Sequence, residues 1–200
     1  MDPMQTPVCM TCEQRQPFTP DQPAGVLRCG LCGSEVPAEF SRFVLVTGAS
    51  GSGKSTVMPL LRASLRPLRR HVVLDADLLL HLSEPNWARW CNDWLLLAFG
   101  LAQSGQTLVL CGAIDPAVLE DLPARTLVAS IDAVVLDCSD DVRTRRLRER
   151  PPWRRWTPTR IGEMLRMAET LRHGGRHRMD TTDMTPQAVA DELVRLLELS

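Results

Sequence analysis

The sequence predicts an α/β fold, a three-layer sandwich around a five-stranded parallel sheet, preceded by a small four-cysteine module. Short apolar runs alternate with helix-like segments from about residue 40 onward, which is typical of parallel strands covered by helices on both faces. A glycine-rich stretch, residues 48–56, follows the first of these runs. Two Cys-x-x-Cys pairs lie ahead of it, in a segment rich in proline and glycine.

Four strands are expected from short, largely apolar runs at Phe43–Thr47, His71–Leu74, Thr107–Cys111 and Ala133–Asp137, and a fifth, from a weak pattern, at Arg178–Asp180. Three helices are expected to start at an N-cap residue followed by proline, at Asp115-Pro116, Thr157-Pro158 and Thr185-Pro186. The first helix should cover residues 54–66 and the last 186–199, because apolar residues recur there near helical spacing.

The glycine-rich stretch is a complete phosphate-binding loop rather than a plain surface turn. It consists of Gly48, Ala49, Ser50, Gly51, Ser52, Gly53, Lys54, Ser55 and Thr56. The glycines let backbone N–H groups converge on phosphate oxygens, the lysine reaches the β- and γ-phosphates, and the Ser55 hydroxyl can ligate Mg²⁺. The positive end of the following helix adds to the attraction. The strand–loop–helix setting therefore predicts a P-loop NTPase fold that binds a nucleotide polyphosphate and Mg²⁺.

Composition limits the classes of protein that remain. Two hundred residues suffice for one domain plus a small module, and 44% of them are hydrophobic. A net charge of −1 gives no general attraction to nucleic acid or membranes, and no apolar run approaches membrane-spanning length. The first residues lack a signal-peptide pattern, so a cytoplasmic location is expected. The seven cysteines then favour metal binding or free thiols over disulfides.

Residues 1–38 are expected to form a zinc-ribbon-like module. The pairs Cys9/Cys12 and Cys29/Cys32 have the spacing of a structural Zn²⁺ site. Four thiolates complete a tetrahedral shell and leave no open position, which argues against a catalytic zinc. So small a segment buries too little apolar surface to fold alone, and metal binding can supply the missing stability. Two disulfides or a redox pair are the alternatives.

Two carboxylates follow the second expected strand. Asp75 and Asp77 are two residues apart, a spacing that puts both on one side of an extended chain, beside the phosphate loop. One can hold a Mg²⁺-bound water, and the other can orient and partly deprotonate an acceptor hydroxyl. The alternative is that one of them only caps the next helix. Asp115 is a further candidate for the metal, since no clean second Walker aspartate follows the third strand.

From about residue 42 onward the chain resembles the small P-loop kinases of the nucleoside, nucleotide, shikimate and gluconate kinase type. The resemblance rests on the phosphate loop, the Asp-x-Asp, an Arg-x-x-x-Arg and an Asp-Thr-Thr at 180–182. It implies a kinase domain over residues 39–200 with a short lid at about 148–158. It also implies roles at the site: Asp77 for the acceptor, Asp75 for the metal shell, Arg146 and Arg150 for the nucleobase and the moving phosphate, and Thr181 and Thr182 for the border of the adenine.

The acceptor is expected beside the Asp-x-Asp. Trp87, Trp90 and Trp94 share one face of the expected helix there, where core packing is the favoured interpretation and a substrate wall the alternative. Trp87 and Arg89 are the candidates for acceptor contacts on this helix, and Arg154 is the candidate from the lid. An exposed basic helix, paired with nearby acidic residues, is the alternative interpretation of the arginine-rich segment 143–150.

The leading functional hypothesis is a kinase that moves the γ-phosphoryl group of Mg²⁺-ATP to a small acceptor, with a nucleoside or nucleoside monophosphate favoured. Lys54 and the lid arginines would stabilise charge on the moving group. The alternative is a nucleotide-dependent switch or a polynucleotide-end kinase, in which the zinc ribbon engages a protein or RNA partner. No membrane partner is expected. Phosphate transfer to a small acceptor without the ribbon would separate the two.

Overall fold

The computed structural model describes residues 7–80, 86–174 and 177–198. A five-stranded sheet of order β5-β6-β4-β7-β8 forms the main body, and every neighbouring pair in it is parallel. Its strands are β4 (Phe43–Thr47), β5 (His71–Asp75), β6 (Thr107–Gly112), β7 (Ile131–Asp137) and β8 (His177–Asp180). All five coincide with expected strands, so the predicted α/β sheet is confirmed.

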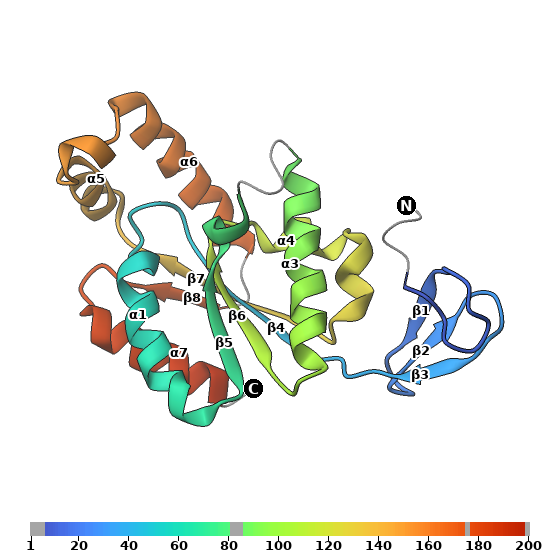
Figure 1. Cartoon of the computed structure of the whole chain (residues 1–200). Coiled ribbons are helices and arrows are strands. Elements are labelled where there is room, and N and C mark those ends of the chain that lie inside the picture. Colours follow the sequence, from blue (N-terminus) through green and yellow to red (C-terminus); the bar gives the residue numbers. More distant parts are fainter. Residues whose placement is uncertain (1–6, 81–85, 175–176, 199–200) are drawn as a thin grey trace.

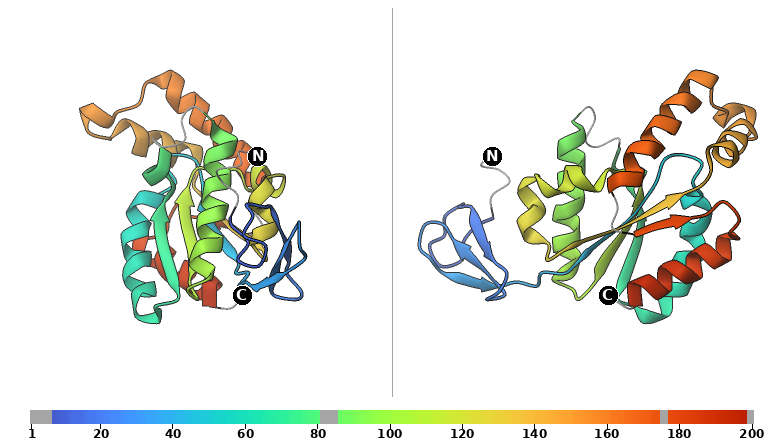
Figure 2. Two further views of the ribbon diagram at one scale, coloured as in Figure 1. Left: turned by 45° about the vertical axis from the view of Figure 1, so that its right-hand side comes forward. Right: turned by 180° about the vertical axis from the view of Figure 1, so that it is seen from behind.

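Helices cover both faces of the sheet, as Figures 1 and 2 show. One face carries α1 (Lys54–Leu65) and α7 (Pro186–Glu198). The other carries α3 (Trp87–Ala102), α4 (Pro116–Glu120) and the 3-10 turn η4 (Pro123–Leu127). Two further helices, α5 (Asp140–Arg148) and α6 (Pro158–Gly174), project beyond the end of the sheet. The three-layer prediction is therefore confirmed.

Alternation along the central strand explains why both faces are covered. In β4, Phe43 and Leu45 join the core under α3, whereas Val44 and Val46 join the core under α1 and α7. Successive side chains of a strand point to opposite faces, so an apolar residue at every position requires two cores. All five residues of β4 are buried.

Helix boundaries differ slightly from those expected. The first helix ends at Leu65, and a 3-10 turn, η2 (Arg66–Leu68), follows it where Pro67 has no N–H to continue the helical bonds. After β5 the chain forms a 3-10 turn, η3 (Ala76–Leu79), before residues that lie outside the described part. The expected caps are present, since Asp115, Thr157 and Thr185 accept bonds from backbone N–H groups of the first turn.

Two tryptophans of α3 belong to the core, as the favoured interpretation predicted. Trp90 and Trp94 are 2% and 0% exposed, and their rings meet edge to face with centroids 6.5 Å apart. We expect Trp94→Ala to lower the free energy of unfolding by about 3–5 kcal/mol, because it leaves a large cavity under the sheet. Denaturant unfolding measures this loss. Leu96→Ala, at an exposed position of the same helix, should cost far less; equal losses would contradict this packing.

A three-stranded antiparallel sheet precedes the main body and lies at the end of the molecule opposite α5 and α6 (Figures 1 and 2). Its strands are β1 (Phe18–Asp21), β2 (Val26–Cys29) and β3 (Glu35–Pro37). The Gln22 amide donates to the carbonyls of Thr126 (2.7 Å) and Val128 (3.0 Å), which attaches this sheet to η4 and to the residue that caps it. No helix in the described part of the chain is long and apolar enough to cross a membrane.

Candidate nucleotide-binding and acceptor site

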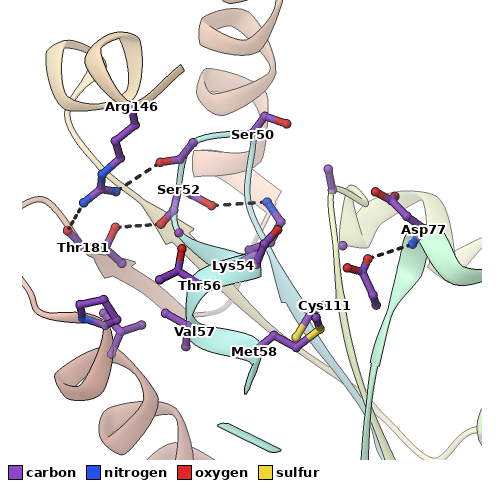
Figure 3. Close-up of a pocket in the computed structure, with 18 of the residues that line it drawn as sticks. Ser50, Ser52, Lys54, Thr56, Val57, Met58, Asp77, Cys111, Arg146 and Thr181 are labelled. Atoms are coloured by element: carbon purple, nitrogen blue, oxygen red, sulfur yellow. Dashed lines mark hydrogen bonds between the residues drawn. The ribbon is translucent and has the colours of Figure 1, made fainter. Parts of the chain in front are cut away.

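A cavity of about 450 Å³ opens at the carboxyl ends of β5 and β6, over the loop between β4 and α1. Ligands of open parallel sheets bind at this edge. Most of the predicted site residues line it: Ser50, Gly51, Ser52, Gly53, Lys54, Ser55, Thr56, Asp75, Asp77, Arg146, Arg150, Arg154 and Thr181. Figure 3 shows Arg146 and Thr181 on one side of the loop and Asp77 on the other.

Glycine is required at two points of the loop. Gly48 has φ 150°, and a Cβ there would collide with the Leu136 carbonyl oxygen of β7. Gly51 has φ 90°, and its Cβ would lie 3.0 Å from Arg143 Cγ of α5. Both positions have left-handed backbone in crowded surroundings, so a side chain at either would distort the loop.

Lys54, the first residue of α1, folds back onto the loop. Its Nζ donates to the carbonyl of Gly48, to the carbonyl of Ala49 at 3.2 Å and to Ser52 Oγ at 3.4 Å. Burial, and then the neighbouring Arg143 guanidinium, lower the pKa of Lys54 from 10.5 to about 8. The ammonium group is held where polyphosphate oxygens would meet the loop. A bound anionic ligand would raise the pKa of Lys54 again, because a nearby negative charge favours the protonated amine.

Asp75 and Asp77 both line the cavity across from the lid arginines. Asp75 Oδ1 also accepts the backbone N–H of Asp77 at 3.0 Å, so this carboxylate caps η3 as well. Burial and the nearby Asp75 charge raise the pKa of Asp77. Asp115, the other metal candidate, caps α4 through a 3.0 Å bond from Ala117 N–H and is not among the described residues that line the cavity.

The lid arginines face the cavity rather than nearby carboxylates. Arg146 donates to the carbonyls of Gly51 (3.2 Å) and Thr181 (3.4 Å). The Arg150 guanidinium lies over the Trp156 ring, 5.5 Å from its centroid. Asp140 pairs with Arg172 instead, at 2.7 Å. Among the described residues, no ion pair joins Arg146, Arg150 or Arg154 to an acidic neighbour in segment 140–149, and all three line the cavity.

Several predicted residues lie apart from this cavity. Trp87 is 45% exposed and stacks on Trp90 with ring centroids 4.4 Å apart, and neither it nor Arg89 is among the described lining residues. Thr182 Oγ1 accepts the Ser139 N–H at 2.9 Å and donates to Asp180, so it ties β8 to the start of α5. Gly48 and Ala49, at the start of the loop, are also not among the described lining residues, and their carbonyls accept hydrogen bonds from Lys54 Nζ.

Two residues that the sequence did not single out lie directly behind the loop. Arg143 and Asp137 are 0% and 2% exposed and form an ion pair of 2.5 Å. Arg143 stands in a run of arginines, where a charged side chain is ordinarily exposed. Its position four residues before the buried Leu147 was the available signal, because residues at this spacing share a helix face.

The four N-terminal cysteines form a second candidate site. All four Sγ atoms lie within 4.8 Å of one another. Cys9 and Cys32 are 3.7 Å apart and Cys12 and Cys29 are 4.0 Å apart, so none of these contacts is a disulfide. A tetrahedral Zn²⁺ with bonds of about 2.3 Å would separate its sulfurs by about 3.8 Å, and the cluster fits that geometry.

The main body matches a known sequence family. The family model described as AAA domain covers residues 44–164, more than half of the chain. The chain belongs to the AAA domain family. The matched segment begins in β4 and runs through the phosphate loop, both carboxylates and the lid arginines into α6. No curated protein sequence is significantly similar to this AAA domain protein.

Several solved structures with the same fold are kinases. The APS kinase CysC of Mycobacterium tuberculosis, in complex with AMPPNP and APS, is 24% identical, with a TM-score of 0.54 over 81% of this chain and 99% of that one. Shikimate kinase from Acinetobacter baumannii, in complex with shikimate, is 18% identical over 80% and 94%, with a TM-score of 0.52. A sugar kinase from Janibacter sp. is 20% identical over 80% and 96%, with a TM-score of 0.58. The AAA domain protein thus has the fold that the sequence resemblance implied.

Proposed function

We propose that this protein is an ATP-dependent phosphotransferase that moves the γ-phosphoryl group of Mg²⁺-ATP to a hydroxyl or phosphate of a small acceptor. One observation carries the proposal: a single cavity is lined by the phosphate loop, by three arginines that form no ion pair with the described acidic residues of segment 140–149 and, opposite them, by two carboxylates. Nucleotide binding alone needs only the loop and its lysine. The added carboxylates suit an enzyme that must also hold a second substrate.

Each group has a task in phosphoryl transfer that follows from its charge and position. The loop amides and Lys54 would bind the β- and γ-phosphates, while Arg146 and Arg150 neutralise charge on the transferring group. Ser55, with Asp75 close by, suits Mg²⁺, which would neutralise charge on the phosphates and orient them. Asp77 would accept a hydrogen bond from the acceptor hydroxyl and align it with the phosphorus.

The surroundings of the cavity support a small acceptor. Only residues from 50 onward line it, so no described residue of the three-stranded sheet contributes to it. Two solved structures with this fold hold a small molecule, APS in an APS kinase and shikimate in a shikimate kinase. We infer a nucleoside or nucleoside monophosphate as the favoured acceptor class, with Arg154 placed to contact an anionic or polar group near Asp77.

Asp77→Asn is expected to lower the transfer rate by about 10²–10⁴-fold while the affinity for Mg²⁺-ATP stays within about twofold, because the amide cannot accept the acceptor proton. The wild-type rate should fall as pH decreases through the raised pKa of Asp77, since only its ionised form accepts that proton. Steady-state rates between pH 4 and 9 measure both effects. Asp115→Asn, outside the cavity, is the matched control; equal activity in Asp77→Asn would remove Asp77 from the mechanism.

The N-terminal residues 1–38 we propose as a structural zinc ribbon and residues 39–200 as the kinase domain with its lid at 148–158. The sulfur distances support Zn²⁺ held by Cys9, Cys12, Cys29 and Cys32. Bound metal would fix the two Cys-x-x-Cys turns against the three-stranded sheet. A cytoplasmic location suits both the reduced thiolates and the supply of ATP.

The nucleotide-dependent switch is the second candidate function. It is favoured by apolar side chains that are exposed in the two Cys-x-x-Cys turns and that could contact a partner. Met10 and Leu31, each inside a Cys-x-x-Cys turn, are 86% and 59% exposed. A nucleotide-controlled partner would require ATP to change the affinity of this surface. Transfer to small acceptors by a protein lacking residues 1–38 would favour the kinase, and loss of transfer with that segment would favour a role for the ribbon in the substrate site.

A further inference from the structure

Cationic side chains hold four consecutive carbonyl oxygens of the phosphate loop. The bonds are Lys54 Nζ to Gly48 O, Lys54 Nζ to Ala49 O (3.2 Å), Arg143 Nη1 to Ala49 O (3.4 Å) and Ser50 O (3.2 Å), and Arg146 Nη1 to Gly51 O (3.2 Å). Lys54 and Arg146 line the cavity, but Arg143 does not. Arg143 therefore holds its two carbonyls from behind the loop.

Arg143 is fixed at its other end by a buried carboxylate. Its Nη2 lies 2.5 Å from Asp137 Oδ1, at the last residue of β7, and both side chains are almost fully buried. Asp137 also receives Arg172 Nε at 2.7 Å and Arg178 Nε at 3.3 Å. Three guanidiniums thus share one carboxylate, and Arg143 is the one of these three with bonds to the phosphate loop.

The buried ion pair between Arg143 and Asp137 is not explained by its contribution to stability alone. Desolvation of a buried ion pair offsets most of its attraction, and an apolar side chain of similar volume is often as stable or more so. Arg143 also packs tightly on the loop, since a Cβ on Gly51 would come within 3.0 Å of its Cγ. The distinctive property of the guanidinium here is its number of fixed donors, which lets one side chain bond a carboxylate and two carbonyls at once.

The direction of the loop carbonyls matters for an anionic ligand. Glycine-rich backbone can rotate its peptide groups at low cost, and a rotated peptide would present a carbonyl oxygen to the cavity where an N–H is needed. A carbonyl in that place repels phosphate oxygen, whereas an N–H binds it. Holding the carbonyls of Ala49 and Ser50 behind the loop therefore favours the arrangement that binds phosphate.

We propose that Arg143 is a positioning residue for the phosphate loop: anchored on Asp137, it keeps the Ala49 and Ser50 carbonyls turned away from the cavity so that the loop amides face the polyphosphate. This role rests on the proposed nucleotide-binding function. Because Arg143 and Arg146 both belong to α5, the helix that leads into the lid also holds the loop from two sides.

The test compares Arg143→Met with Arg178→Met. Both variants remove one cation from Asp137, but only the first removes bonds to the loop. Calorimetric titration with Mg²⁺-ATP and with Mg²⁺-tripolyphosphate should show about tenfold or weaker binding of both ligands by Arg143→Met, the loss expected for charge-assisted hydrogen bonds. Arg178→Met should stay within about twofold of the wild type. Equal affinity of Arg143→Met and wild type would overturn the proposal.

Hydrogen exchange of the ligand-free proteins gives a readout that does not depend on activity. The amides of residues 48–57 should exchange faster in Arg143→Met than in Arg178→Met, while those of β4 and β7 remain protected in both. If the wild type binds neither ligand, the proposed function fails, yet the exchange comparison still decides whether Arg143 holds the loop. Unchanged exchange of the loop in Arg143→Met would contradict it.

A second variant guards against misfolding. Arg143→Met leaves Asp137 with two partners, and the double variant Arg143→Met/Asp137→Asn removes the buried charge altogether. Arg172 then keeps its 2.7 Å pair with Asp140, and Arg178 is half exposed, so neither cation is left buried and unpaired. The double variant should fold and show the same weak binding and fast loop exchange. Wild-type affinity in the double variant would overturn the proposal.

Discussion

Lys54→Met is expected to lower the rate of phosphoryl transfer by about 10³-fold or more, because it removes the cation that neutralises charge on the transferring group. Methionine keeps most of the hydrocarbon stem, so packing against the loop is preserved. Transfer of label from Mg²⁺-ATP to the acceptor measures the loss. Transfer by Lys54→Met at the wild-type rate would contradict the assignment of Lys54.

The same variant should not be less stable than the wild type without ligand. The folded-state pKa of Lys54, about 8, lies below its ordinary 10.5, so folding disfavours the charged lysine. The penalty is present in full below pH 8 and disappears as pH rises above 10.5. Thermal unfolding at pH 7 should therefore show an equal or higher midpoint for Lys54→Met. A loss of activity with retained stability separates a role in the reaction from a role in folding.

Lys54 is also the only lysine in the sequence, which gives a direct test of where the nucleotide binds. An amine-acylating reagent should modify Lys54 and the N-terminal amine alone. Because the neutral amine reacts, the rate at Lys54 should increase as pH rises through about 8. Mg²⁺-ATP should protect Lys54 and leave the N-terminal amine reactive, which serves as the internal control. Labelling of Lys54 that ATP does not slow would contradict nucleotide binding at the loop.

Removal of the metal should unfold the three-stranded sheet and leave the main body folded. Purified protein is expected to hold one Zn²⁺ per chain, and binding supplies on the order of 10 kcal/mol to so small a module. A chelator, or Cys29→Ser, should abolish the metal content in native mass spectrometry and expose residues 7–38 to protease. Helix content should change little, because the helices belong to the main body.

A matched cysteine distinguishes the metal site from the general effects of losing a thiol. Cys91 is buried in α3, away from the cluster, so Cys91→Ala should keep its zinc. If Cys29→Ser also retained one zinc per chain with an intact N-terminal sheet, the four-cysteine assignment would be wrong. Isolation of the protein with Cys9 bonded to Cys32 as a disulfide would instead favour the oxidised alternative.

Local patterns in the sequence were enough to predict the architecture. Four strands of the large sheet are short runs with apolar residues on both faces, as in Phe43–Thr47, and such runs predict buried parallel strands. In the fifth, β8, Met179 alone is apolar and buried, which is why its pattern was the weakest. The phosphate loop was predictable because its motif lies in consecutive residues, 48–56. Trp90 and Trp94 were predictable as core because helical spacing puts them on one face.

Contacts between distant segments were not predictable in the same way. Asp137 meets Arg143, Arg172 and Arg178 only after β7, α5, α6 and β8 have packed together. Trp87 shares the helical face of Trp90 but lies at the first turn of α3, where the sheet no longer covers it. Helical periodicity predicts which face of the helix a side chain lies on. It does not predict how far along the helix that face is covered by the sheet.

The measurement that tests the central claim most directly is transfer of labelled phosphate from Mg²⁺-ATP to a panel of acceptors, with Lys54→Met as the blank. The panel would hold nucleosides, nucleoside monophosphates, sugars, shikimate-like alcohols and RNA 5′ ends. A kinase of this kind should label one class of small acceptor, with a nucleoside or its monophosphate expected, and Asp77→Asn should lose that product. ATP binding without transfer to any acceptor would contradict the kinase assignment and favour the switch, and label on RNA alone would assign the acceptor site to a polynucleotide.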